Sequence, residues 1–250
     1  MKSRKERLDV LVVERGLAES RAKAQALILA GQVVVGDQRV DKPGAQVPVE
    51  AELRLKGEVL PYVSRGGLKL KGAIERFGLD VRGKVAADIG ASTGGFTDCL
   101  LQEGVVRVHA IDVGYGQLHE KLRTDPRVRS RERVNARYLT GEDLPEKVGV
   151  VVIDVSFISL TQVLPSVLPF LEPGGLLVAL VKPQFEVGRE RIGKGGVVRD
   201  AAARQEAIDA VVAFAREQGL TVRGLMDSTV PGPAGNVEAL LVADKPRAGA

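Results

Sequence analysis

Four charged residues that lie far apart in the chain have the types and positions needed to move a proton. They are two lysines and two acids, Lys69, Asp154, Lys182 and Glu238. Asp154 ends one strongly apolar run, and Lys182 directly follows another. Side chains at the carboxyl ends of strands in a doubly wound sheet converge on one crevice. The pattern therefore predicts that these residues meet at a single catalytic point.

A lysine can act as a base only after it has lost its own proton, and free lysine titrates near ~10.4. Burial and a second ammonium favour the neutral amine, whereas nearby carboxylates oppose it. We predict Lys182 as the base and Lys69 as the second cation, with Asp154 and Glu238 holding both lysines. Taken singly, Lys182 is also compatible with a surface lysine and Glu238 with a solvent-facing strand acid. Four such coincidences are much rarer than one.

A glycine-rich segment at residues 88–95 is predicted beside this group, and three interpretations compete for it. As a dinucleotide turn it lacks the second glycine of G-x-G-x-x-G. It fits the G-x-S-x-G elbow of hydrolases, in which the catalytic serine precedes the acid and the histidine along the chain. That order needs a histidine late in the chain, and both histidines lie before its middle. The third interpretation is a turn that holds S-adenosylmethionine, where an acid at the strand end meets the ammonium of the ligand. The contacts predicted for that cofactor are Asp88, Gly90, Ser92, Gly94, Gly95, Phe96, Asp112, Asn135 and Asp154.

Strand and helix patterns alternate over most of the chain, which is typical of an α/β fold. Helices are predicted at residues 159–171 and 201–218, and Asn135 is predicted to end the third strand and face the adenine edge of the cofactor. The predicted strands are residues 85–89, 106–112, 131–135, 150–154, 176–181, 221–226 and 237–243. These elements resemble the seven-stranded, Rossmann-like sheet of the S-adenosylmethionine methyltransferases, and the resemblance implies that the last strand inserts antiparallel.

The first 60 residues form a smaller pattern of two helices and a hairpin, similar to an S4-like α+β domain that binds RNA. The helices are predicted at residues 7–15 and from the N-cap Ser20 to Gly31, followed by a hairpin at residues 33–40. Residues 61–67 read as a linker and residues 68–250 as the larger domain. Residues 1–76 carry a net charge of +5 and residues 77–250 a net of −1. RNA contacts are predicted at Arg4, Arg7, Arg21, Lys23, Arg65, Arg189, Arg191 and Lys194.

Composition narrows the class of protein and its compartment. The 250 residues are 44% hydrophobic and 27% charged, as in an ordinary globular protein. No apolar run reaches the ~18–20 residues of a membrane helix. The basic N-terminus has no apolar core behind it, and a single cysteine, Cys99, allows no intrachain disulfide. We expect a cytoplasmic protein with no metal and no membrane partner.

Five short segments complete the pattern, and with them the chain resembles the hemolysin A (TlyA) family of ribosomal-RNA ribose 2′-O-methyltransferases over nearly its whole length. The resemblance implies an FtsJ-like methyltransferase domain, S-adenosylmethionine as cofactor, and a Lys-Asp-Lys-Glu tetrad at Lys69, Asp154, Lys182 and Glu238. It also implies that the target is a cytidine ribose. The segments are residues 64–69, 112–118, 156–160, 182–188 and 232–238.

Three other functions account for the sequence less completely than this one. A non-catalytic RNA-binding or ribosome-assembly protein would not need an intact tetrad. A pore-forming hemolysin would need a membrane segment or a strongly amphipathic basic helix. A small-molecule methyltransferase would explain the glycine turn but not the S4-like module. The chain ends at Ala250, before the helical extension of longer family members, which favours large-subunit over small-subunit RNA as the target.

Overall fold

A computed structural model describes residues 4–36, 38–56, 60–193, 195–232 and 235–247. The chain divides into two compact units, which are described separately. One unit comprises Met1–Leu60, Gly193–Val197 and Pro231–Asn236. The other comprises Pro61–Ile192, Val198–Val230 and Val237–Ala250. None of the helices described is both long and apolar enough to cross a membrane.

The smaller unit is built on two helices, α1 (Leu8–Glu14) and α2 (Arg21–Leu29). Ser20 is the N-cap of α2, as predicted, and its side chain accepts a hydrogen bond from the Lys23 backbone N–H at 3.3 Å. The predicted hairpin is also present, as β2 (Val33–Val35) paired antiparallel with β3 (Gln38–Arg39). Its core joins both helices to the strands through Leu8, Leu11, Val12, Ala24, Ile28, Val33, Val47 and Leu53.

Sequence reasoning missed three strands of this unit. They are β1 (Lys5–Arg7), β4 (Gln46–Pro48) and β5 (Leu53–Leu55). β1 pairs with β4, and β5 joins β2 to complete a three-stranded sheet. Each strand has only three residues, which is too short to show the alternation from which strands are predicted.

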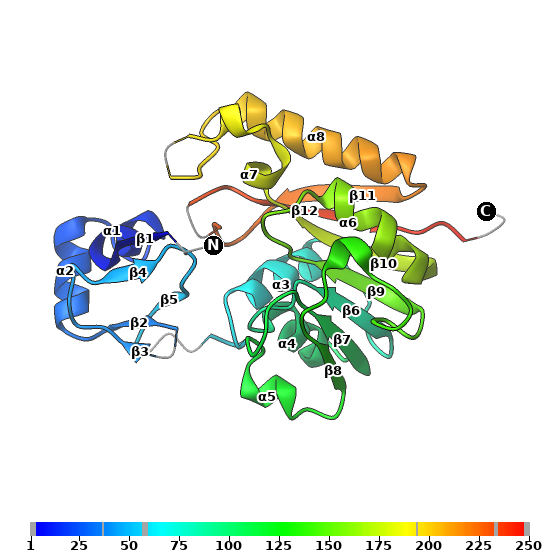
Figure 1. The fold of residues 1–250 in the computed structure, drawn as a ribbon, viewed down its shortest axis with the longest axis horizontal. Coiled ribbons are helices and arrows are strands. Elements are labelled where there is room, and N and C mark those ends of the chain that lie inside the picture. Colours follow the sequence, from blue (N-terminus) through cyan, green and yellow to red (C-terminus); the bar gives the residue numbers. More distant parts are fainter. Residues whose placement is uncertain (1–3, 37, 57–59, 194, 233–234, 248–250) are drawn as a thin grey trace. The chain divides into compact units, whose positions relative to one another are not determined.

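The larger unit contains a seven-stranded sheet, so the predicted fold class is confirmed (Figure 1). The strand order is β11-β12-β10-β9-β6-β7-β8. The strands are β6 (Val85–Ile89), β7 (Arg107–Ile111), β8 (Val128–Arg131), β9 (Val148–Ile153), β10 (Leu171–Val181), β11 (Thr221–Asp227) and β12 (Ala239–Asp244).

Helices cover both faces of this sheet, because alternate residues of each central strand point to opposite sides. One face packs on α3 (Gly66–Phe77) and α4 (Gly95–Gln102) through residues such as Ala86, Val108 and Val150. The other face packs on α6 (Leu160–Val167) and α8 (Ala201–Glu217) through residues such as Ile89 and Val151. Short helices complete the unit at α5 (Glu120–Arg123), α7 (Pro183–Glu186), η1 (Ala136–Tyr138), η2 (Leu168–Phe170) and η3 (Arg189–Arg191).

The antiparallel insertion of β12 determines where the site forms. β6, β7, β8, β9 and β10 run parallel, whereas β12 runs antiparallel to both β10 and β11. The amino end of β12 therefore lies at the same edge as the carboxyl ends of the parallel strands. Val181 at the end of β10 pairs with Ala239 at the start of β12. This register brings Lys182 and Glu238 to the same edge.

The third strand of the sequence prediction was wrong. β8 spans Val128–Arg131 rather than residues 131–135, so Asn135 lies four residues beyond its end. Three of the four β8 side chains are exposed at the edge of the sheet. An exposed edge strand needs no continuous apolar run, so the sequence held no strong signal for its bounds.

Candidate active site

The four predicted charged residues form two ion pairs at the carboxyl edge of the sheet, one of them buried and the other half-buried at Asp154. Nζ of Lys69, on α3, lies 2.6 Å from Oε2 of Glu238. Nζ of Lys182 lies 2.6 Å from Oδ1 of Asp154. Glu238 is completely buried, and both lysines are nearly so. The structure thus brings all four residues together, in two pairs across neighbouring elements.

Lys182 has a second partner that sequence reasoning did not include. Its Nζ also donates a hydrogen bond to Oγ of Ser156 at 2.9 Å. A neutral lysine amine has two N–H donors and one lone pair. Asp154 and Ser156 occupy two positions around the nitrogen, so a third position is left for a substrate proton. This arrangement suits a base that is oriented by its other contacts.

The two carboxylates balance the charge of the two ammonium groups. Burial by itself raises the pKa of Asp154, but Lys182 and then Lys69 outweigh burial, and the pKa of Asp154 is lowered. Asp154 is therefore ionised at neutral pH. Oε1 of Glu238 is buried and has no hydrogen-bond partner among the residues described. That oxygen is an acceptor within the site that a ligand or water can use.

The glycine turn joins β6 to α4 and passes close to Asp154. Gly90 has φ +86°, and a Cβ at this position would collide with the backbone carbonyl of Asp154. Gly94 has φ +99° and is the N-cap residue of α4, which begins at Gly95. Only glycine adopts these angles without strain while allowing so close an approach. The turn is consequently narrow and lies directly beside the ion pairs.

Asp112 connects this turn to the loop that follows β7. Its carboxylate accepts a hydrogen bond from the Ser92 backbone N–H at 2.8 Å and from the Gly114 N–H at 2.6 Å. Ser92 itself has a positive φ of 48°. Asp112 is half-buried, so it can still reach a ligand in the turn. It directly follows the last residue of β7, at the same edge as Asp154.

Asp88 is the group that best tests whether a cationic cofactor fits. It is completely buried, and its Oδ2 accepts a hydrogen bond from Oγ1 of Thr97 at 2.6 Å. Oδ1 has no partner among the described residues. Burial raises the pKa of Asp88 to about 7, and the nearby carboxylates of Asp154 and Asp112 add to the rise although Thr97 opposes it. A buried acceptor without a cation fits a ligand that brings an ammonium group.

Two other predicted cofactor contacts lie differently from expectation. Asn135 is exposed, and its side chain accepts a hydrogen bond from the Arg137 backbone N–H at 3.0 Å. It therefore caps η1 instead of ending a strand. Phe96 is 3% exposed and packs in the core on the α3 and α4 face. Its ring is not at the surface of the turn.

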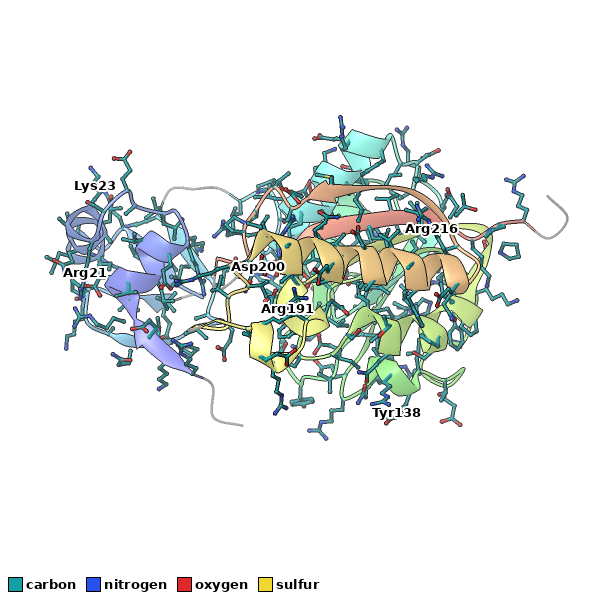
Figure 2. The ribbon with its side chains drawn as sticks, turned by 90° about the horizontal axis from the view of Figure 1, so that it is seen from above. Arg21, Lys23, Tyr138, Arg191, Asp200 and Arg216 are labelled. Atoms are coloured by element: carbon teal, nitrogen blue, oxygen red, sulfur yellow. The ribbon has the colours of Figure 1, made fainter. Side chains whose placement is uncertain are left out.

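Two of the four predicted RNA-binding cations of the smaller unit, Arg7 and Arg21, meet at one buried acid. Arg7 and Arg21 both pair with Asp9, at 3.0 and 2.9 Å, and Gln25 donates to the same carboxylate. Arg7 foremost lowers the pKa of Asp9. Arg4 lies 4.0 Å from Glu6, and Figure 2 shows Arg21 and Lys23 on α2. The cluster at the start of the two helices exists, but a carboxylate partly neutralises it.

The cations predicted in the larger unit are dispersed. Arg65 is half-buried just before α3, and Arg189 is exposed. Arg191 pairs with Glu206 and lies 3.9 Å from Asp200, at the start of α8 (Figure 2). Lys194 lies outside the described residues, as do residues 233–234 of the last family segment.

Sequence reasoning missed two residues that shape the site, Phe157 and Glu186. Phe157 is 87% exposed, has a φ of +64°, and lies 5.0 Å from the Phe185 ring. Glu186 accepts hydrogen bonds from Ser159 Oγ at 2.5 Å and from the Leu160 N–H at 2.9 Å. Burial raises the pKa of Glu186 despite these two contacts. Glu186, at the end of α7, thereby joins the segment after β10 to the segment after β9. The only sequence signal for Phe157 and Glu186 was that both lie in segments shared with the family.

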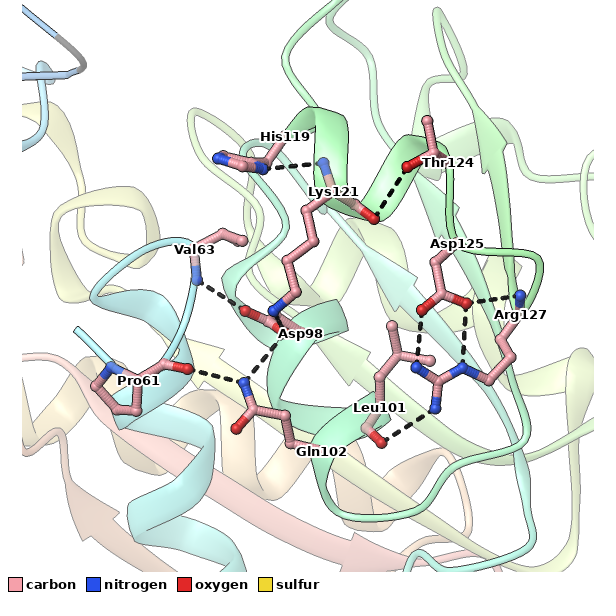
Figure 3. A network of polar contacts seen from close by, with 10 residues as sticks. All are labelled: Pro61, Val63, Asp98, Leu101, Gln102, His119, Lys121, Thr124, Asp125 and Arg127. Carbon is pink, nitrogen blue, oxygen red and sulfur yellow. Dashed lines mark hydrogen bonds and ion pairs between the residues drawn. The ribbon is translucent and has the colours of Figure 1, made fainter. Parts of the chain in front are cut away.

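A separate hydrogen-bond network holds α4, the helix that follows the glycine turn. Figure 3 shows buried Asp98 of α4 accepting hydrogen bonds from the Val63 N–H at 2.8 Å, from Gln102 at 3.1 Å and from Lys121 at 3.1 Å. Lys121 lies on α5, and the preceding His119 donates its backbone N–H to the Thr93 carbonyl at 3.1 Å. Both oxygens of Asp98 thus have partners, in contrast to Asp88.

Comparisons with known proteins agree with this geometry. Residues 62–245 match the family model of the FtsJ-like methyltransferases, and residues 6–53 match that of the S4 domain. A provisionally named rRNA methyltransferase of Bacillus subtilis, YqxC, is 50% identical over 96% of this chain and 86% of its own length. The 16S/23S rRNA (cytidine-2'-O)-methyltransferase TlyA of Mycobacterium tuberculosis is 46% identical over 96% of this chain and 90% of its own length.

Solved structures share the fold. A provisionally named hemolysin of Streptococcus thermophilus is 48% identical, with a TM-score of 0.82 over 98% of this chain and 90% of that one. A provisionally named S-adenosylmethionine-dependent methyltransferase of Listeria monocytogenes is 16% identical and has a TM-score of 0.54 over 72% of this chain and 98% of that one. The second likeness concerns the fold alone.

The unpaired oxygen of Asp88 leads to a prediction about stability. The pKa of Asp88 is raised from its ordinary value, so the folded ligand-free protein binds an extra proton between about pH 4 and pH 7 and loses stability as the pH rises. Asp88→Asn should therefore raise the melting temperature at about pH 8 by ~4 °C or more and by a clearly smaller amount at about pH 5, where less of this stability has been lost. Calorimetric scans of both proteins at the two pH values measure this.

Asp98→Asn is the matched control, because both of its carboxylate oxygens have partners. That substitution should lower the melting temperature at both pH values. If Asp88→Asn is destabilising at high pH as well, the unpaired oxygen does not carry the cost that the geometry indicates.

Proposed function

The chain belongs to the FtsJ-like methyltransferases, in the hemolysin A (TlyA) family, and has an S4 domain; from this we propose that it methylates the ribose 2′-oxygen of a cytidine in ribosomal RNA, with S-adenosylmethionine as methyl donor. The observation that carries the proposal is a pair of ion pairs at the sheet edge, Lys69 with Glu238 and Lys182 with Asp154. Lys182 also donates a hydrogen bond to Ser156. The reaction belongs in the cytoplasm, where ribosomes are assembled.

Lys182 is proposed to remove the proton of the 2′-hydroxyl. The O–H proton moves to Nζ of Lys182 as the oxygen attacks, and the new bond joins that oxygen to the methyl carbon. Asp154 and Ser156 orient the amine and then stabilise the ammonium that forms. Lys69 and Glu238 supply the second charge pair, so the four-residue group is neutral overall once Lys182 carries the transferred proton.

The glycine turn and its acids are proposed to hold the cofactor. Asp88 would pair its free oxygen with the ammonium, and Asp112 would accept from the ribose hydroxyls. When bound, S-adenosylmethionine supplies an electrophilic methyl group on a sulfonium, whose carbon–sulfur electrons stay with sulfur when the bond breaks. Gly90 keeps the turn close to Asp154, so the donor and the base share one edge.

Phe157 is proposed to receive the base of the target nucleotide. An enzyme that modifies a nucleotide within folded RNA must bring it out of its stack, and an exposed aromatic ring offers a new stacking surface. A bulky residue at positive φ is strained, which points to a role for its position. The ring contact with Phe185 and the contacts of Glu186 hold the loop in place.

The S4-like unit is proposed to position the RNA through backbone contacts. The proposed division is residues 1–60 for this unit, 61–67 for the linker and 68–250 for the methyltransferase domain. The proposed contacts are the predicted set Arg4, Arg7, Arg21 and Lys23, with Arg65, Arg189, Arg191 and Lys194 from the rest of the chain. A patch with few aromatic residues favours phosphate contacts over base reading.

Substitution of Lys182 tests the proposed base. Lys182→Ala should abolish methyl transfer and leave cofactor affinity near the wild-type value, because the turn is intact. Lys182→Arg should not restore activity, since a guanidinium stays protonated and cannot accept a proton. Single-turnover transfer of labelled methyl to unmodified ribosomal subunits measures the chemical step. A fully active Lys182→Arg enzyme would make this residue a positioning cation.

Substitution of Asp112 tests the cofactor pocket. Asp112→Ala should weaken S-adenosylmethionine binding by about 1–3 kcal/mol, the scale of losing a charged hydrogen bond. Titration calorimetry measures the affinity. The control is Asp125→Ala, which removes an acid that pairs with Arg127 outside the site and should not affect binding. Equal affinities for all three proteins would remove Asp112 from the pocket.

Substitution of Phe157 tests the proposed contact with the target base. Phe157→Ala should lower kcat/KM for RNA roughly 10–100-fold, which corresponds to about 1–3 kcal/mol of stacking. Cofactor affinity should stay unchanged, and Phe157→Tyr should keep most of the activity because it retains the ring. Wild-type kinetics for the alanine variant would show that the exposed ring does not contact the substrate.

A further inference from the structure

One short segment of the larger unit contains much of its positive charge. Residues 77–250 are close to neutral as a whole, but residues 121–137 hold seven Lys or Arg residues and only two acids. The predicted RNA contacts include none of these seven. The net charge of residues 77–250 does not reveal these cations, because acids elsewhere in the unit cancel them.

Three of the seven cations are neutralised by nearby carboxylates. Lys121 lies 3.1 Å from Asp98, Arg123 lies 3.9 Å from Glu120, and Arg127 lies 2.7 Å from Asp125. The other four have no carboxylate within 4.0 Å in the part of the chain that the structure describes. We call these four the arginine row: Arg129, Arg131, Arg133 and Arg137.

The arginine row follows the edge of the sheet toward the active site. Arg129 and Arg131 lie on β8, two residues apart, so they point to the same face. They pair in register with His109 and Ile111 of β7, which are buried, while both arginines are exposed at the open edge. The Arg131 carbonyl accepts a hydrogen bond from the Asp112 N–H at 3.0 Å. The row therefore begins beside the proposed cofactor pocket.

Exposed tyrosines accompany the last two arginines. The Arg133 guanidinium lies 4.4 Å from the centre of the Tyr115 ring, and that of Arg137 lies 5.6 Å from Tyr138. Tyr115 is 71% exposed and Tyr138 66%; Figure 2 shows Tyr138 at the outside of the unit. Arg133 has a positive φ of 61°, which is uncommon for arginine. Flat guanidinium and phenol groups with free faces suit a nucleic acid.

Protection of an edge strand is the simplest other reason for these charges. Charged side chains on an edge discourage pairing with other chains. That role accounts for Arg129 and Arg131 on β8. It does not account for Arg133 and Arg137, which lie beyond the strand, or for the two exposed rings.

We propose that the arginine row, with Tyr115 and Tyr138, is a second RNA-binding surface on the methyltransferase unit. It contacts the phosphates of the RNA that flanks the target nucleotide, and the rings stack on unpaired bases. Four cations without carboxylate partners complement a polyanion, and their start at Asp112 places them along the path of a strand that enters the site. This inference rests on the proposed function, because it takes ribosomal RNA as the substrate.

The salt dependence of RNA binding tests the proposal. The variant R129Q/R131Q/R137Q removes three exposed charges and leaves the strained Arg133 in place. The probe is unmodified ribosomal RNA transcribed in vitro, titrated over a series of salt concentrations. The slope of log affinity against log salt should become shallower by about two units, at somewhat less than one unit per lost phosphate contact. Cofactor affinity, measured by calorimetry, should match the wild type.

The charge-matched control is R107Q/R127Q/R223Q, whose arginines pair with Glu146, Asp125 and Asp244. It should keep the wild-type slope. Equal slopes for all three proteins overturn the proposal, and so does an equal loss in both variants, which would reflect net charge alone. Aggregation of the arginine-row variant with an unchanged slope would assign the row to edge protection. Failure of the proposed function would be recognised separately from failure of the arginine-row proposal. In that case the wild-type protein would transfer no methyl group to ribosomal subunits.

Discussion

Two lysines and two acids lie together at one point, where all but Asp154 are buried, and the rest of the site depends on their charges being balanced there. An unpaired ion in a protein interior costs several kcal/mol, whereas a paired one can be tolerated. Lys69 pairs with Glu238 and Lys182 with Asp154, each at 2.6 Å. The acids are thus a condition for burying the lysines at all. A site of this kind has to be inherited as a whole, because the loss of any one charge leaves another uncompensated.

The same edge holds a group that is less well satisfied. Asp88 is buried with one oxygen unpaired, and burial raises its pKa to about 7. Asp98, one turn into α4, shows that the fold can satisfy a buried aspartate completely. The difference between the two supports the proposal that Asp88 binds a ligand, at some cost to the stability of the free protein.

Sequence reasoning predicted the central strands and the catalytic edge because both follow from strong local signals. The apolar runs of β9 and β10 define their own ends, and Asp154 and Lys182 come at those ends. β8 and the three-residue strands of the smaller unit lack such runs, so their positions depend on pairing that the sequence does not display. Phe157 and Glu186 lie in loops, where function depends on contacts between distant segments. The arginine row was missed for another reason. The net charge of residues 77–250 sums positive and negative residues, so a local excess of arginines does not appear in it.

The antiparallel position of β12 also has a consequence for the order in which the protein becomes functional. Lys69 and Glu238 are 169 residues apart in the chain. Glu238 reaches the edge only when β12 has entered the sheet between β10 and β11. Contacts of such long range form late, because the loop between them must first be closed. A nascent or partly folded chain can already contain the glycine turn and three members of the tetrad. It remains chemically incomplete until β12 is inserted, so the entry of this strand into the sheet is a condition for catalysis.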